Sequence, residues 1–189
     1  MKLLTILAAI AASVVLAACG TTQGSSGSSA AQAAPGIGAP VRDGNFEFVV
    51  LSVDRSKTAG PDDDQSTAQG DYVNVLLSVK NTGNEAQSYW PRDQHLIING
   101  NKFDAAPITG APGDGDNINP GLGIAKTVVS FDVPVGAAPE AIELHDSAFS
   151  GGVKVNLAGT PLAKPQAWKN SKPRRPGKWC LLTAVGTGN

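Results

Sequence analysis

Alternation of apolar and polar residues dominates the middle of this 189-residue chain. It is clearest in residues 72–80, where apolar and polar side chains take turns along the segment. The apolar positions are Val73, Val75, Leu77 and Val79, and the polar ones include Asn74, Ser78 and Lys80. A period of two is that of a β-strand with one buried face and one face in water. The segment is therefore expected to lie in a half-buried sheet.

Further apolar segments of similar length follow one another, separated by turn residues. They are residues 46–53, 87–90 and 95–98, a return strand from Lys102, and residues 127–133, 142–145 and 153–157. Asn99-Gly100 is the strongest short hairpin signal among the turns. Beyond the N-terminal leader, no run of ten or more residues has a helical period. These seven or so strands predict an all-β protein whose antiparallel sheets form a β-sandwich over residues 41–157.

The N-terminus predicts export and lipid attachment. Residues 3–18 carry no charge, and a helix of that length rises only about 24 Å, less than the roughly 30 Å hydrocarbon core of a bilayer. The sequence Leu16-Ala17-Ala18-Cys19 then matches a bacterial lipobox. We interpret residues 1–18 as a lipoprotein signal peptide and Cys19 as the lipidated N-terminus of a protein held outside the cytoplasm, at the cell membrane or envelope. The alternative is a plain secretory signal with an incidental cysteine.

The two segments that flank the sandwich have the composition of disordered chain. Residues 19–40 are predicted to be a flexible linker, because 16 of the 21 residues from 20 to 40 are Gly, Ser, Ala or Pro. Residues 158–189 contain six basic residues, four prolines and no acidic residue, and are predicted to be a disordered basic tail. The tail is either a second site of attachment to an anionic surface or an extension appended after the family-like part of the chain. Cys180 within it is expected to be an unpaired thiol.

Charge is small in total but unevenly placed. The formal net charge is −1, which excludes a uniformly basic protein that binds nucleic acid. Residues 41–157 carry a net charge of −8, whereas residues 158–189 carry +6. The expected partners are the membrane, through the lipid anchor, and an envelope protein or wall polymer.

Four motifs in the predicted sandwich carry a resemblance to a known family. They are Val-Lys-Asn-Thr-Gly at residues 79–83, Leu-Ile-Ile-Asn-Gly-Asn-Lys-Phe at 96–103, Asn-Pro-Gly at 119–121 and Val-Val-Ser-Phe-Asp-Val-Pro at 128–134. Residues 41–157 resemble the uncharacterised immunoglobulin-like domain of actinobacterial lipoproteins, which is related in fold to secreted mycobacterial immunoprotective antigens. The resemblance implies an immunoglobulin-like sandwich outside the cytoplasm and supplies no catalytic residue. Unlike antibody domains, residues 41–157 contain no cysteine pair.

Two acidic loops are candidates for binding a hard cation. Asp62, Asp63 and Asp64 form one, and Asp114 and Asp116 belong to the other. Ca²⁺ is bound by six to eight oxygen ligands of this kind. The second loop is not an EF-hand, because Ile118 stands where an oxygen ligand is needed. Charge exposed to solvent in a surface loop is the alternative interpretation.

The segment around Trp90 is the strongest candidate for a protein contact. Tyr89, Trp90 and Arg92 combine large rigid aromatic area with a guanidinium, a combination enriched at binding hot spots. Packing of an edge segment on the sandwich explains the same residues without a partner.

The two histidines suggest catalysis less strongly. His95 and His145 lie among polar neighbours, but no nucleophile elbow or metal-site motif accompanies them. We therefore predict no enzyme, no catalytic residue and no cofactor. The sequence favours a lipid-anchored module for binding or surface display. An ion or small-ligand carrier using the acidic loops is the first alternative, and a hydrolase that uses the histidines is the second.

Overall fold

A computed structural model describes residues 34–163 and residue 169 of the chain. Cys19, most of the predicted linker and Cys180 lie outside these described residues. The strands are β1 (Pro40–Asp43), β2 (Phe46–Ala59), β3 (Ser66–Asn81), β4 (Gln87–Ser88), β5 (His95–Ile98), β6 (Asn101–Asp104), β7 (Asn117–Ile118), β8 (Gly123–Val133), β9 (Ala141–Leu144) and β10 (Val153–Asn156). One short 3-10 helix, η1 (Pro91–Asp93), joins β4 to β5.

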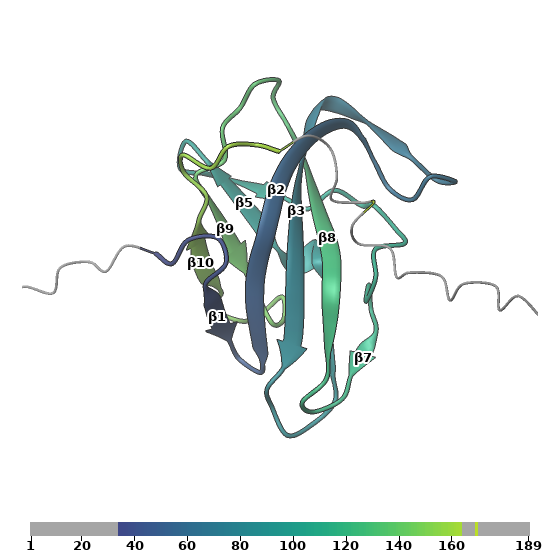
Figure 1. Ribbon diagram of the computed structural model, residues 1–189, viewed down its shortest axis with the longest axis vertical. Helices are drawn as coiled ribbons and strands as arrows, with labels where there is room; N and C mark the ends of the chain where they lie inside the picture. The colour runs from purple at the N-terminus through teal and green to yellow at the C-terminus, as the bar shows by residue number, and fades with distance from the viewer. Residues whose placement is uncertain (1–33, 164–168, 170–189) are drawn as a thin grey trace, which may run out of the picture. The chain divides into compact units, whose positions relative to one another are not determined.

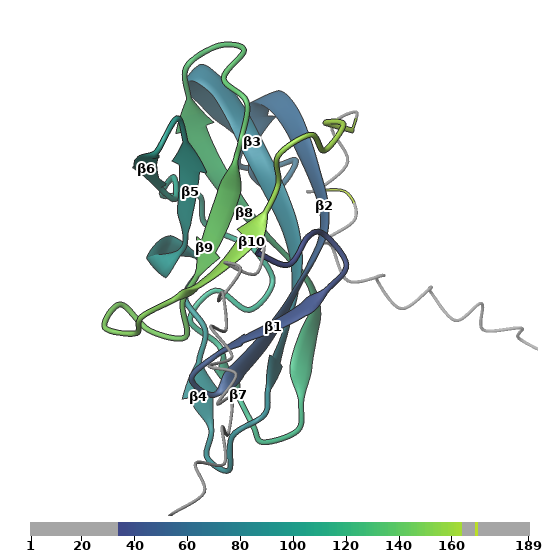
Figure 2. The ribbon, with the colours of Figure 1, turned by 90° about the vertical axis from the view of Figure 1, so that its left-hand side faces the viewer.

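The strands form two facing four-stranded sheets and one small ribbon. The first sheet has the order β1-β2-β3-β8, the second has the order β10-β9-β5-β6, and β4 pairs with β7. Every pairing between these strands is antiparallel. Figure 1 shows the first sheet in front of the second, and Figure 2 shows the two layers from the side. The prediction of an all-β antiparallel sandwich is confirmed.

The core lies between the two sheets and follows the alternation of the sequence. All four apolar residues of the segment 72–80 are buried in it, together with Phe131 from β8 and Ile142 from β9. Aromatic rings fill one part of the core, because Phe46 and Tyr89 meet edge to face with 6.1 Å between their ring centroids. Fully burying side chains of this size stabilises a fold by about 1.5–3 kcal/mol each.

The outer face of β3 is the main correction to the predicted pattern. Asn74, expected to face water, is only 2% exposed. On the same face, Ala111 from the loop after β6 packs on Leu76 and Val128. Asn74 is then satisfied by other side chains: its amide donates to Asp54 at 2.7 Å, and its carbonyl accepts from Ser130 at 2.7 Å. The alternation in the sequence could not predict these contacts with other segments of the chain.

The turn between β5 and β6 confirms the hairpin signal. Asn99 has a φ of 50° and Gly100 a φ of 73°, the left-handed values that a type I′ turn requires at both central positions. The two short strands β1 and β7 were not predicted, and the segment 87–90 supplies only the two residues of β4.

The folded body extends beyond the predicted limits of 41 and 157 at both ends. The amide of Asn156 donates to the carbonyl of Pro35 at 2.7 Å, so residues assigned to the linker already contact the sandwich. At the other end, Leu162 packs against the core, and the amide of Ala163 donates to the carbonyl of Val53 at 3.1 Å. Residues 158–163, predicted as the start of a disordered tail, therefore lie against β2.

Candidate functional site

Three groups of residues that the sequence suggests separately meet at one corner of the sandwich. We call this the η1 corner and define it as residues 90–95 together with residues 113–116 and 143–150. Its centre is Gln94, which is completely buried. The side-chain amide of Gln94 donates to the carbonyls of Trp90 at 3.0 Å and His145 at 3.1 Å, and its oxygen accepts from the amide of His145 at 2.8 Å. Gln94 therefore fixes the end of β9 against η1.

Trp90 and Arg92 form a ridge at this corner. The guanidinium of Arg92 lies 4.0 Å from the centroid of the Trp90 ring, a cation–π geometry. The Trp90 ring packs on Gly115, where a Cβ atom would lie only 2.7 Å from the ring. A side chain at position 115 would push the ring away, so glycine is required there. The Arg92 side chain is 66% exposed. The guanidinium is therefore held against the Trp90 ring and open to solvent.

Tyr89 does not belong to this exposed ridge. It is 0% exposed and packs among Phe46 and Phe48. Burial, helped by the charges of Asp114 and Asp93, raises the pKa of the Tyr89 hydroxyl well above its ordinary range. The structure places Tyr89 in the core, apart from the exposed ridge, as the packing alternative expects.

The acidic loop containing Asp114 and Asp116 borders the ridge. The amide of Gly115 donates to the carbonyl of Tyr89 at 2.9 Å, which ties the loop to the segment before η1. Burial raises the pKa of Asp114, the positive charge of Arg92 lowers it, and the negative charge of Asp116 raises it. The charges of Asp114 and Arg92 therefore offset each other. No hydrogen bond joins the two side chains among the described residues.

The two acidic loops lie in different parts of the fold. Asp62, Asp63 and Asp64 lie in the turn between β2 and β3, a different loop from that of Asp114 and Asp116. Within residues 34–163 and at 169, no three His, Cys, Asp or Glu side chains gather as a ready-made metal site. Neighbouring aspartates repel one another unless an ion draws them together, which explains why closeness in sequence does not make them converge.

The two histidines lie side by side at the same corner. Their ring centroids are 5.3 Å apart, with the planes at 84°. His95 Nδ1 lies 3.0 Å from an oxygen of Asp104, and His145 Nδ1 lies 3.1 Å from the hydroxyl oxygen of Ser150. The sequence suggested both histidines but could not pair them, because their proximity depends on the pairing of β5 with β9.

Glu143 and Gln94 are site residues that sequence reasoning missed. Glu143 is paired with His95 across β5 and β9 and is only 6% exposed. Burial raises the pKa of Glu143, but the hydrogen bond and charge of Lys102, together with the charge of Lys154, outweigh burial, so the pKa is lowered. The only sequence signal for Glu143 was a charged residue at an alternating strand position, and such a position ordinarily indicates a solvent-exposed face of the sheet.

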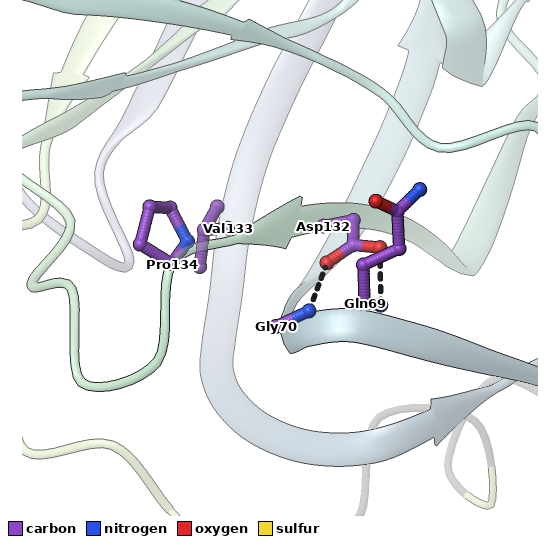
Figure 3. Close-up of a pocket in the computed structure, with 5 residues that line it drawn as sticks. All are labelled: Gln69, Gly70, Asp132, Val133 and Pro134. Atoms are coloured by element: carbon purple, nitrogen blue, oxygen red, sulfur yellow. Dashed lines mark hydrogen bonds between the residues drawn. The ribbon is translucent and has the colours of Figure 1, made fainter.

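A shallow hollow elsewhere on the surface is lined by a carboxylate that already accepts hydrogen bonds within the fold. It measures about 320 Å³ and is lined by Gln69, Gly70, Asp132, Val133 and Pro134. Figure 3 shows the Asp132 carboxylate turned to the backbone of β3, where it accepts from the amides of Gln69 at 2.8 Å and Gly70 at 3.0 Å. Its charged group is therefore committed to holding β3 to β8.

Comparison with known proteins identifies the family. The model of the family described as a domain of unknown function, DUF4352, matches residues 35–155. The chain belongs to the DUF4352 family. No curated protein matches the chain. Among the described residues of this DUF4352 protein, no helix combines the length and the apolar character needed to span a bilayer.

Similarity to the solved structure of MPT63 supports the fold. The secreted protein MPT63 from Mycobacterium tuberculosis aligns with 66% of this chain and 98% of its own, at 12% identity and a TM-score of 0.50. An uncharacterised β-sandwich protein from Clostridium difficile aligns with 64% of this chain and 91% of its own, at 14% identity and a TM-score of 0.42. The similarity to a secreted mycobacterial β-sandwich confirms the fold relationship that the motifs suggested.

Proposed function

We propose that this DUF4352 protein is a lipid-anchored extracytoplasmic lipoprotein whose immunoglobulin-like sandwich binds a partner at the cell envelope. Its role is binding or display rather than catalysis. The observation that carries the proposal is the exposed Arg92 guanidinium stacked on Trp90. Aromatic and arginine side chains held on a rigid scaffold are the usual anchors of protein interfaces.

The surroundings of the ridge support a contact role. Trp90 is backed by Gly115, and its carbonyl is held by buried Gln94, so little side-chain entropy remains to be lost on binding. Arg92 adds a planar fork of donors that suits a carboxylate or phosphate group. An acidic envelope protein or an anionic wall polymer has the complementary charge.

Membrane attachment rests on the sequence Leu16-Ala17-Ala18-Cys19. A diacylated cysteine holds a protein nearly permanently, because each buried CH₂ contributes about 0.8 kcal/mol. The secreted character of MPT63 supports a location outside the cytoplasm. Cys19→Ala is expected to move the protein from the detergent phase to the aqueous phase in a phase-separation assay of cell lysates. Unchanged partitioning of the variant would refute lipid anchoring.

The contact surface is tested separately by photo-crosslinking in intact cells. A photoreactive amino acid placed at position 92 is expected to capture a specific envelope component, whereas the same group at exposed Lys80 on β3 is not. When the photoreactive amino acid stands at a neighbouring position, Arg92→Ala should reduce the yield of the crosslinked adduct at least tenfold. A tenfold loss corresponds to about 1.4 kcal/mol at an interface anchor. An identical adduct from positions 80 and 92, or none from position 92, would contradict the proposed surface.

A further inference from the structure

Glu143 and His145 contain polar atoms that the fold leaves unused. Their side chains are 8% and 9% exposed. Glu143 Oε2 and His145 Nε2 are buried and have no hydrogen-bond partner among the residues described. Leaving a buried polar atom unpaired costs about 1–3 kcal/mol, so native proteins seldom keep one without a reason.

The hydrogen bonds of His145 fix which of its ring nitrogens is free. The hydroxyl of Ser150 donates to the carbonyl of Ser147 at 3.1 Å, so its oxygen accepts from His145 Nδ1 at 3.1 Å. The carbonyl of Ser150 lies 3.3 Å from the same nitrogen. With its proton on Nδ1, a neutral ring carries its lone pair on Nε2, which faces Glu143. Nε2 and Glu143 Oε1 are 3.4 Å apart.

His95 has the same arrangement. Its Nδ1 lies 3.0 Å from the Asp104 carboxylate, which accepts a hydrogen bond from Nδ1–H, so a neutral ring carries its lone pair on Nε2. Histidines that bind a metal through one nitrogen ordinarily donate the other N–H to a carboxylate or a backbone carbonyl. Both histidines of this pair have such a partner, and both lie beside one ionised carboxylate.

We propose that Glu143, His145 and His95 bind a zinc ion at the η1 corner. Zinc takes nitrogen and carboxylate oxygen ligands at about 2.0–2.2 Å in a tetrahedron, which sets two ligands roughly 3.3–3.5 Å apart. The 3.4 Å between His145 Nε2 and Glu143 Oε1 equals that spacing. These two residues supply a preformed pair of ligands.

His95 completes the site by a side-chain rotation. The described side chains do not yet converge as a group of three, so one of them must move. His95 is the one able to do so, because its partner Asp104 is 86% exposed and therefore weakly constrained. The 5.3 Å between the two ring centroids already brings the rings within reach of one ion. A fourth position remains for water or a donor from a partner.

Lys102 is a built-in competitor for the ion. Its ammonium donates to Glu143 Oε1 at 3.0 Å, and the Lys102 side chain is 54% exposed. A zinc ion at Glu143 would repel this ammonium and displace it into solvent. The proposal therefore predicts that removing the ammonium strengthens zinc binding, an effect that a structural role for the histidines does not produce.

The test is a calorimetric titration of the detergent-solubilised full chain with Zn²⁺, in a Cys19→Ser, Cys180→Ser background that removes both thiols. We expect one ion per chain. Glu143→Gln and His145→Ala should each weaken binding at least tenfold, and His95→Ala should weaken it less. Lys102→Met should tighten binding several-fold. Asp63→Asn with Asp64→Asn, in the exposed turn between β2 and β3, is the matched control and should leave the affinity unchanged.

Nuclear magnetic resonance of the imidazole nitrogens keeps the proposal testable if His145→Ala does not fold. Zn²⁺ should shift the Nε2 resonances of both histidines in the background protein and leave the Nδ1 resonances nearly in place. Absence of binding at 1 mM Zn²⁺, equal affinity in Glu143→Gln, or weaker binding in Lys102→Met would overturn the proposal. None of these outcomes depends on the lipid anchor or on a partner for Arg92.

Discussion

Asp71 on β3 and Glu143 on β9 are both buried carboxylates, yet their surroundings differ in one respect. Asp71 accepts from Lys57 at 2.6 Å, Arg55 at 2.8 Å and the amide of Gly136 at 3.2 Å, so both of its oxygens are used. Glu143 uses one oxygen on Lys102, and its other oxygen has no partner within the described chain. Contacts within the fold therefore account for both oxygens of Asp71 but for only one oxygen of Glu143.

The same contrast separates two clusters of polar side chains, one on each sheet. On the first sheet, Asn74, Asp54 and Ser130 form a buried network in which the amide of Asn74 is fully engaged. On the second sheet, His145 keeps an unpartnered nitrogen beside Glu143. Polar groups satisfied inside the fold are expected to contribute stability, whereas unsatisfied ones mark positions that another requirement preserves.

Among the substitutions of polar side chains that test this comparison, Asn74→Ala gives the largest effect. The substitution removes hydrogen bonds to Asp54, Ser56 and Ser130 in a covered part of the sheet. We expect the free energy of unfolding to fall by about 2–4 kcal/mol, because partners of a lost buried amide are left unsatisfied. Urea denaturation measures the change. Asn84→Ala, at an exposed loop position, is the control and should change stability by less than about 0.5 kcal/mol.

Asp71→Asn tests the satisfied carboxylate through pH. Hydrogen bonds from Lys57, Arg55 and Gly136 lower the pKa of Asp71 far below its unfolded value of 3.8, although burial opposes them. A depressed pKa stabilises the fold above the unfolded value, and this contribution is lost as the pH falls through the folded value. Wild type should therefore exceed Asp71→Asn in stability at pH 6, and the difference should shrink below about pH 4. A difference that is equal at pH 6 and pH 2.5 would show that Asp71 is not held ionised.

The architecture was predictable because it depends on local alternation, whereas the site depends on tertiary contacts. Val73, Val75 and Leu77 are buried as their spacing predicts. Gln94 carries no local signal, since its burial follows from the meeting of η1 with the end of β9. The exposure of Asn74 was mispredicted for the same reason, because Asn74 is held by Asp54 and Ser130, which come from other strands of the sheet.

Glu143→Gln tests the unsatisfied carboxylate in metal-free protein. The amide oxygen can take the place of Oε1 and still accept from Lys102, while the new NH₂ takes the place of Oε2, which has no partner in the described residues. The free energy of unfolding should therefore change by less than about 1 kcal/mol, well below the loss in Asn74→Ala. Urea denaturation in the presence of a chelator measures this difference. A loss as large as that of Asn74→Ala would show that Glu143 is as structural as Asp71.

Tyr89→Phe should have the smallest effect and sharpens the comparison within the core itself. The Tyr89 hydroxyl is buried and has no hydrogen-bond partner among the described residues, while its ring packs on Phe46 and Phe48. Removing the hydroxyl should leave stability unchanged or raise it by up to about 1 kcal/mol, since an unpaired polar atom leaves the core. Tyr89→Ala, which also removes the ring, should cost about 3–5 kcal/mol. If Tyr89→Phe is instead destabilising by more than about 1 kcal/mol, the hydroxyl has a bonded partner and Tyr89 belongs with the satisfied groups.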